Sequence, residues 1–196
     1  MHTRKRLTTW AVAVLSLLMI VSTQAVGTAA ADESYGEYTV GGRILDAYKA
    51  TGGPDKWGNP TMNEAAAAFG GRFQRFEKDT SFYWKASVSG GTAHQIGGAI
   101  RFRWGQYNFE RGPLGFPVTD ELDAAGKGRK QFFEGGNMYY GAATGTHPVW
   151  GQILNKYAAA GGPGGRLGLP VGDEYRQGPN GSRYAQDFQA GRLIWP

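Results

Sequence analysis

The chain has 196 residues, of which 41% are hydrophobic and 19% are charged, as in ordinary globular proteins, but its 32 glycines and 9 prolines are unusually many. It contains no cysteine, which excludes a disulfide scaffold, a thiolate metal site and a cysteine nucleophile. The formal net charge is +5, but basic and acidic residues are interspersed, so the sequence lacks the concentrated basic face that a nucleic-acid partner requires.

The first 31 residues have the order of a secretory signal peptide. Three basic residues at 4–6 precede an apolar run over 10–21, and small residues at 29–31 offer a cleavage site. The apolar run of 12 residues is shorter than the roughly 20 that span a bilayer. We therefore expect cleavage after Ala31 and no membrane partner afterwards. The remaining chain would carry 18 basic and 16 acidic residues, a net charge of only +2.

A four-residue turn recurs three times in the rest of the chain. The copies are Trp57-Gly58-Asn59-Pro60, Leu114-Gly115-Phe116-Pro117 and Leu167-Gly168-Leu169-Pro170. Four residues can match by chance, but the segments on both sides recur as well. Self-similarity at this period indicates a repeat architecture.

Each copy predicts the same succession of elements. An apolar stretch containing tyrosine and ending at Gly and Pro predicts a short helix, at 44–48, 100–107 and 153–157. Two aromatic runs after the Pro turn predict a β-hairpin, at 73–76 with 82–84, 132–133 with 138–140, and 184–188 with 193–195. The sequence thus predicts an α+β, mainly β fold with repeats at about 42–97, 98–150 and 151–196.

The two ends of the repeated region suggest a closure. The first two copies finish with similar segments at 94–98 and 147–151, whereas the third stops before reaching one. Residues 38–42 have the same Val and Gly positions. We therefore expect residues 35–41 to complete the third repeat, giving a closed or nearly closed propeller-like ring without an unpaired sheet edge.

These residues resemble the LGFP-repeat family, which is named after the four-residue motif found here as Leu114-Gly115-Phe116-Pro117. The resemblance extends from about Val40 to Pro196 and includes the Val118-Thr119-Asp120-Glu121 segment after the turn. Such repeats accompany envelope enzymes in exported actinobacterial proteins. The resemblance implies attachment to the cell wall through arabinogalactan or peptidoglycan, beside a separately encoded envelope enzyme. The first copy departs from the pattern, with Asn59 and Asn63 where the second has Phe116 and Asp120.

Polar residues that recur once per repeat favour architecture over catalysis. His94 and His147 occupy equivalent positions, and so do Glu64, Glu121 and Glu174. Asp120 and Asp173, just after the Pro turns, are expected to accept backbone hydrogen bonds and fix the loops. No catalytic residue, metal site or cofactor is assigned, although three acids meeting at the centre of a ring would offer a place for a cation.

Aromatic pairs at the hairpin ends are the stronger binding candidates. Adjacent strand residues point to opposite faces, so one member of each pair can enter the core while the other offers a flat ring to a sugar. The predicted polysaccharide-binding residues are Tyr83, Trp84, Tyr139, Tyr140, Trp195, His94 and His147.

The sequence therefore favours an exported, non-enzymatic module that binds cell-envelope polysaccharide, secreted or associated with the cell wall. Two alternatives stay open. One is an envelope hydrolase or esterase with an unrecognised site, in which a single histidine would be essential. The other is a secreted protein-interaction or inhibitor module.

Overall fold

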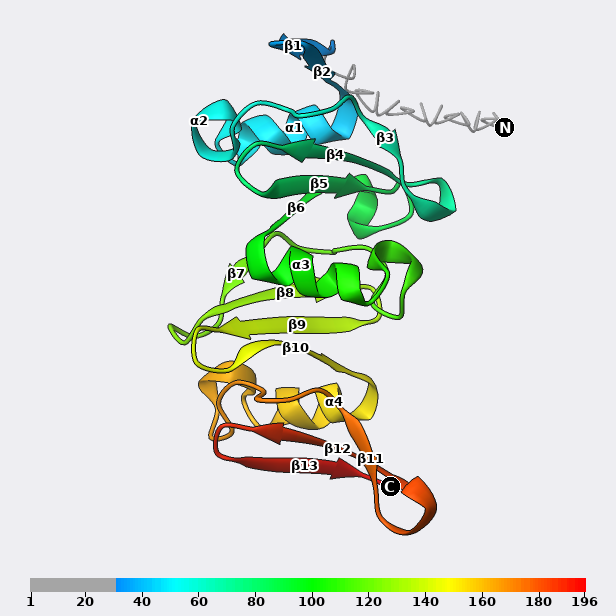
Figure 1. Cartoon of the computed structure of the whole chain (residues 1–196), viewed down its shortest axis with the longest axis vertical. Coiled ribbons are helices and arrows are strands. Elements are labelled where there is room, and N and C mark those ends of the chain that lie inside the picture. The colour runs from blue at the N-terminus through cyan, green and yellow to red at the C-terminus, as the bar shows by residue number, and fades with distance from the viewer. Residues whose placement is uncertain (1–30) are drawn as a thin grey trace, which may run out of the picture.

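The computed structural model describes residues 31–196, so almost all of the predicted signal peptide lies outside the described residues. Figure 1 shows an elongated stack in which helices and sheets alternate along the long axis. Its two ends are a hairpin near the N-terminus and a sheet that holds the C-terminus. No helix within 31–196 has the length and apolarity needed to cross a membrane.

The stack contains one hairpin and three helix–sheet layers. The hairpin is β1 (Glu33–Tyr35) and β2 (Tyr38–Val40). The first layer is α1 (Gly42–Ala50), α2 (Gly53–Trp57), β3 (Ala65–Ala66), β4 (Arg72–Phe76), β5 (Thr80–Trp84) and β6 (His94–Gly97). The second is α3 (Gly98–Gln106), β7 (Leu122–Asp123), β8 (Arg129–Phe133), β9 (Gly136–Gly141) and β10 (Gly145–Trp150). The third is α4 (Gly151–Ala159), β11 (Tyr175–Gln177), β12 (Arg183–Phe188) and β13 (Gly191–Trp195).

All three sheets are antiparallel and follow the chain in order: β3-β4-β5-β6, β7-β8-β9-β10 and β11-β12-β13. The predicted helices and central hairpins are therefore confirmed. Single-turn 3-10 helices lie in the loops at Ala68–Gly70 (η1), Ser89–Gly91 (η2), Phe109–Arg111 (η3), Gly162–Gly164 (η4) and Pro179–Gly181 (η5).

Each main helix starts at a glycine where a strand ends. Gly42, Gly98 and Gly151 have φ values of 50°, 48° and 52°, a left-handed conformation that a side chain disfavours. This residue turns the chain from a strand of one layer directly into the helix of the next. Helix α3, for example, packs on β6 of the sheet before it and on β9 and β10 of its own sheet.

The Leu-Gly-Phe-Pro turn is held by the hairpin that follows it. Gly115 has a φ of 68°, and a Cβ there would lie 2.7 Å from Glu134 Oε2. The same Oε2 accepts a 2.9 Å hydrogen bond from the Phe116 N–H, and Pro117 forms a β-bridge with Phe133. Equivalent bonds run from Asn59 N–H to Glu77 and from Leu169 N–H to Gln189. The turn therefore sets the geometry of each layer.

A buried glutamine joins each layer to the strand before it. The Gln131 amide donates from Nε2 to Gln95 O at 2.6 Å and to Thr119 O at 2.8 Å. Gln74 donates in the same way to Thr39 and Met62, and Gln186 donates to Pro148 and Gly172. All three glutamines are fully buried, and each amide donates to one carbonyl of the preceding strand and one of its own layer.

The expected ring closure is wrong, because the layers form an open stack. Strand β2 pairs with β1 rather than with β13, and the two segments lie at opposite ends of the molecule (Figure 1). Residues 35–41 complete the first layer, not the third. Tyr35 meets Tyr48 of α1 edge to face at 5.3 Å, as Tyr83 meets Trp104 and Tyr139 meets Tyr157. The hairpin thus replaces the last two strands of a preceding sheet.

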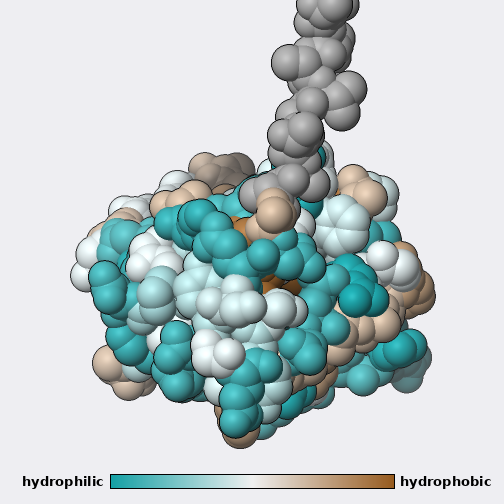
Figure 2. Space-filling model, turned by 90° about the horizontal axis from the view of Figure 1, so that it is seen from above, coloured by the Kyte–Doolittle hydropathy of each residue, from teal (hydrophilic) through white to brown (hydrophobic). Residues whose placement is uncertain are grey.

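Successive layers also alternate in direction. Strands β3 and β11 lie on one side of the stack and β7 on the other (Figure 1). The three repeated acids are therefore kept apart rather than gathered at a centre. Glu64 pairs with Arg72, Glu121 pairs with Arg129, and Glu174 accepts a hydrogen bond from Trp150. Viewed from the N-terminal end, the surface is mainly hydrophilic (Figure 2).

Candidate functional site

A cleft lined by three aromatic side chains lies between α4 and the last sheet, and we call it the C-terminal cleft. Its volume is about 220 Å³, and it is lined by Trp150, Gly151, Gln152, Ile153, Glu174, Tyr184 and Trp195.

Three different segments bring the aromatic residues of the C-terminal cleft together. Trp150 is the last residue of β10, and it precedes the left-handed glycine that starts α4. Tyr184 and Trp195 face each other across the β12–β13 pair. Trp150 donates from Nε1 to Glu174 Oε1 at 3.3 Å and meets Tyr107 edge to face at 5.5 Å. These contacts hold an aromatic wall beside a carboxylate.

Trp195 has the most accessible ring of the three. Its exposed fraction is 37%, whereas Trp150 and Tyr184 are half-buried. The Lys156 ammonium lies 5.1 Å from the Trp195 ring centroid and donates a 2.7 Å hydrogen bond to Ile194 O. This cation fixes the end of β13 beside α4. The cleft therefore offers an apolar ring together with the Glu174 carboxylate and the Gln152 amide, groups that could contact both the C–H face and the hydroxyls of a sugar.

The first layer has a polar counterpart of the C-terminal cleft. It is lined by Asp32, Thr39, Gly41, Gly42, Asn63, Glu64 and Arg72 and has a volume of about 300 Å³. Gly41, Glu64 and Arg72 stand at the positions that Trp150, Glu174 and Tyr184 occupy in the C-terminal cleft. Arg72 and Glu64 form an ion pair of 2.5 Å there. Each cleft includes the glutamate that comes directly before the first strand of its sheet, Glu64 before β3 and Glu174 before β11.

A sequence model of the LGFP repeat matches residues 58–112 and 114–165, which together make up more than half of the chain. The chain belongs to the LGFP-repeat family. The matched segments are two tandem LGFP repeats, and the Leu167–Pro170 turn with its hairpin follows them. No curated protein matches this sequence.

The histidines predicted to recur by duplication lie at the junctions between successive layers of the stack. His147 Nδ1 lies 2.7 Å from Asp173 Oδ1, and its Nε2 lies 2.9 Å from Thr144 O. Tyr107 O–H donates to Asp173 Oδ2 at 2.6 Å, and Arg103 pairs with the same oxygen. Burial alone would raise the pKa of Asp173, but these hydrogen bonds and the Arg103 charge outweigh burial and hold it below its usual value.

The junction between the first and second layers has an equivalent His–Asp pair, but a serine hydroxyl replaces the backbone carbonyl at the histidine Nε2. His94 Nδ1 lies 3.4 Å from Asp120 Oδ1, which also accepts a 2.8 Å hydrogen bond from Gln95 N–H. His94 Nε2 lies 2.8 Å from Ser89 Oγ. Burial opposes ionisation of Asp120, yet its bonds to His94 and Gln95 lower its pKa. Asp120 thus accepts a backbone hydrogen bond as expected, but from the preceding strand rather than from its own loop.

The aromatic pairs alternate between core and surface as the strand geometry predicts. Tyr83 and Tyr139 are buried, and burial raises the pKa of Tyr83 to about 12. Trp84 and Tyr140, the second members, are half-buried. Trp84 donates from Nε1 to Gly91 O at 2.7 Å. In the third pair both Ile194 and Trp195 are exposed, because no other layer among the described residues packs on them.

The seven predicted binding residues do not come together in one site. They are spread over the successive layers of the stack, and of the seven only Trp195 lines a described cleft together with other aromatic rings. Sequence reasoning did not single out Trp150, Glu174 and Tyr184 for this cleft. A signal was present, since Trp150 replaces the glycine found at 41 and 97, and Tyr184 replaces the arginine found at 72 and 129. These are departures from the repeat.

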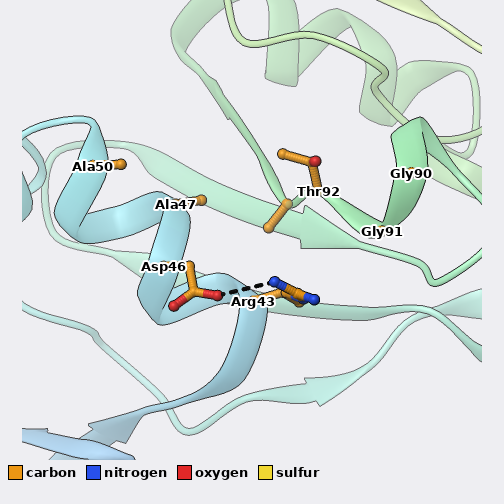
Figure 3. A pocket seen from close by; sticks show the side chains of 8 residues that line it. Arg43, Asp46, Ala47, Ala50, Gly90, Gly91 and Thr92 are labelled. Carbon is orange, nitrogen blue, oxygen red and sulfur yellow. Dashed lines mark hydrogen bonds and ion pairs between the residues drawn. The ribbon is translucent and has the colours of Figure 1, made fainter. Parts of the chain in front are cut away.

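Another cleft separates α1 from the segment before β6 (Figure 3). It has a volume of about 250 Å³. Ala47 and Ala50 of α1 face Thr92 across it, and the only ion pair drawn there, Arg43 with Asp46, spans 3.4 Å within one helix. No aromatic side chain lines this cleft. Residues 31–196 also contain no cluster of three or more His, Asp or Glu side chains that could hold a metal ion.

Proposed function

We propose that this LGFP-repeat protein binds cell-envelope polysaccharide and that the C-terminal cleft is its non-catalytic binding site. One observation carries the proposal. Where the equivalent positions of the other copies hold a glycine and an arginine, the C-terminal cleft has Trp150 of β10 and Tyr184 of β12, and these two rings line the cleft with Trp195 and Glu174. Architecture alone does not require the replacement, because the first layer builds the same place from Gly41 and Arg72.

The chemistry of the cleft supports a sugar as ligand. Indole and phenol rings provide flat apolar faces, and the Glu174 carboxylate and Gln152 amide provide hydrogen-bonding groups at the edge. The cleft is open and small, which suits one or two sugar units of a polymer rather than an enclosed small molecule. A weak site of this kind becomes useful on a polymer, where many ligand units are presented together.

The setting of the proposal is the cell surface. The signal-peptide pattern of residues 1–31 supports export, and the family resemblance supports arabinogalactan or peptidoglycan as the wall component. Attachment of this chain would hold it beside a separately encoded envelope enzyme. In contrast to three equivalent sites, the described clefts differ from one another, and the proposal rests on the one that Trp150, Tyr184 and Trp195 line.

Sedimentation with purified cell walls tests the proposal. We expect Trp195→Ala and Tyr184→Ala each to weaken binding about tenfold, equivalent to about 1.4 kcal/mol, because each removes one ring from the cleft. The matched control is Phe102→Ala, which removes a 72% exposed aromatic ring from α3. Separate assays with purified arabinogalactan and peptidoglycan identify the wall component. Unchanged binding of both cleft variants, or equal loss in the Phe102 variant, would refute this site.

A further inference from the structure

Three side chains at the first layer junction have the order of an acyl-transfer triad. Ser89 Oγ lies 2.8 Å from His94 Nε2, and His94 Nδ1 lies 3.4 Å from Asp120 Oδ1. A triad of this kind is recognised by its geometry and not by sequence position, so the absence of a Gly-x-Ser-x-Gly motif does not count against it. We propose that Ser89, His94 and Asp120 form a second, catalytic site that hydrolyses carboxylic esters.

The hydrogen bonds favour the histidine tautomer that this chemistry needs. Asp120 Oδ1 can only accept from His94, because Asp120 is ionised when its pKa is low. The proton therefore sits on His94 Nδ1, and Nε2 is left as an acceptor that faces Ser89 Oγ. Ser89 O–H also donates to Val118 O at 3.1 Å, so the hydroxyl must turn from that carbonyl to His94 Nε2 before the serine can act as the nucleophile. Nε2 is the base that takes the serine proton.

Comparison with the next junction shows that the serine is an addition. The loop over 84–93, which joins the paired residues Tyr83 and His94, is three residues longer than the loop over 140–146 that joins Tyr139 and His147. In the shorter loop, the backbone carbonyl of Thr144 contacts the histidine Nε2. At the second junction the histidine Nε2 donates to this carbonyl, whereas the longer loop places at the same position a hydroxyl, which can donate to Nε2 as well as accept from it.

The longer loop also presents Ser89 to solvent. Ser89, Gly90 and Gly91 all have left-handed backbone conformations, with φ values of 49°, 63° and 75°. The serine is exposed, whereas only 12% of the His94 side chain is exposed. Residues 90–93 form one wall of the cleft in Figure 3, whose other wall includes Ala47 and Ala50. Ser89 does not itself line this cleft, but the adjoining Gly90 does, and the small residues of the cleft fit a short acyl group better than a long chain.

The reaction balances with water as the only co-reactant. Ser89 Oγ attacks the ester carbonyl carbon while His94 Nε2 takes the hydroxyl proton. Collapse of the tetrahedral intermediate breaks the bond to the leaving alcohol oxygen, which takes that proton from His94, and leaves an acyl-serine. Water then attacks the acyl carbon, again with His94 as base, and releases the carboxylic acid and free Ser89. Asp120 orients His94 and stabilises its charged form throughout.

The test uses p-nitrophenyl acetate and a fluorophosphonate probe on the whole exported chain. We expect release of p-nitrophenolate above the buffer rate, and an adduct of the probe on the peptide that contains Ser89. Ser89→Ala and His94→Gln should both reduce the rate to that of buffer. Ser87→Ala is the matched control, because Ser87 is an exposed serine two residues away that makes no described hydrogen bond, and it should keep the full rate.

Labelling of the unmodified protein keeps the proposal falsifiable even if a variant misfolds. An adduct on another serine, no adduct at all, or full hydrolysis by a folded Ser89→Ala variant would overturn it. Wall binding separates this site from the C-terminal cleft. Ser89→Ala should sediment with cell walls as the unmodified chain does, whereas Trp195→Ala should keep esterase activity.

Discussion

At the N-terminal end of the stack, the hairpin β1–β2 covers α1, and Tyr35 packs on Tyr48 as an interior strand would. At the C-terminal end, the sheet β11-β12-β13 is the last layer, and Ile194 is 38% exposed where Tyr83 and Tyr139 are buried. The first end thus imitates a missing layer, while the second end is left uncovered. An exposed sheet at the end of a repeat array must be kept soluble by other means.

The uncovered end is protected by charge. Asp187 of β12 and Arg192 of β13 face each other and form an ion pair with two hydrogen bonds. The equivalent positions in the first two sheets hold no ion pair, since they are occupied by Arg75 with Ser81 and by Phe132 with Asn137. Tyr175 adds a 3.2 Å hydrogen bond to Asp187. Lys156 binds the carbonyl of Ile194 on the edge strand. The two ends therefore differ in a physically understandable way. At the N-terminal end the buried side of helix α1 needs apolar residues packed against it, and the hairpin supplies them. At the C-terminal end the outer face of a sheet can carry polar and charged side chains instead.

The largest expected loss of stability tests whether the β1–β2 hairpin is attached to the first layer as firmly as one layer is attached to the next. Gln74→Ala removes the bonds to Thr39 and Met62, and Gln131→Ala removes the equivalent bonds at an interior junction. Each leaves two carbonyl groups without a donor, so we expect the free energy of unfolding in urea to fall by about 2–4 kcal/mol in both variants. A loss for Gln74→Ala below about 1 kcal/mol, beside a full loss for Gln131→Ala, would mean that the hairpin is only loosely attached.

The sequence predicts the elements of this fold better than their assembly. The hairpins and the helices that follow each strand were predictable from Gly, Pro and aromatic spacing. The direction of stacking was not, because a repeat shows which segments are alike but not which face of a unit meets the next. The Val and Gly positions of residues 38–42 correctly identified a strand equivalent to β6. In the structure, Tyr35 of β1 occupies the position of Tyr83 in β5. Strand β2 therefore pairs with β1, as β6 pairs with β5, and it does not pair with β13.

The candidate sites were less predictable for a related reason. A search for what the copies share finds Tyr83, Tyr139, His94 and His147, which hold the core and the junctions. The C-terminal cleft and the Ser89 loop arise where one copy departs from the others. Trp150, Tyr184 and the three-residue extension carrying Ser89 are visible in the sequence, but only the fold brings each beside a carboxylate or a histidine.

A smaller effect separates the covered end from the uncovered one. Tyr35→Ala removes an edge-to-face contact with the buried Tyr48, and we expect the free energy of unfolding to fall by about 2 kcal/mol. Ile194→Ala truncates a partly exposed side chain that no layer covers, so the expected loss is below about 0.5 kcal/mol. Thermal unfolding of both variants measures the contrast. Equal losses would show that Ile194 is buried in solution, for example by a second copy.

The smallest effect is a difference in acid sensitivity along the stack. The N-terminal junction uses Asn63, which accepts a hydrogen bond from Thr39 N–H and does not titrate, whereas the C-terminal junction uses Asp173. The pKa of Asp173 is lowered in the folded state, so its contribution to stability is present above the unfolded value of about 3.9 and is lost as the pH falls through the folded pKa. Hydrogen exchange between pH 5 and pH 3 should therefore increase in α4 and β10 before it increases in α1. In Asp173→Asn, exchange in α4 should depend less on pH; an unchanged profile in that variant would assign the acid sensitivity to other carboxylates.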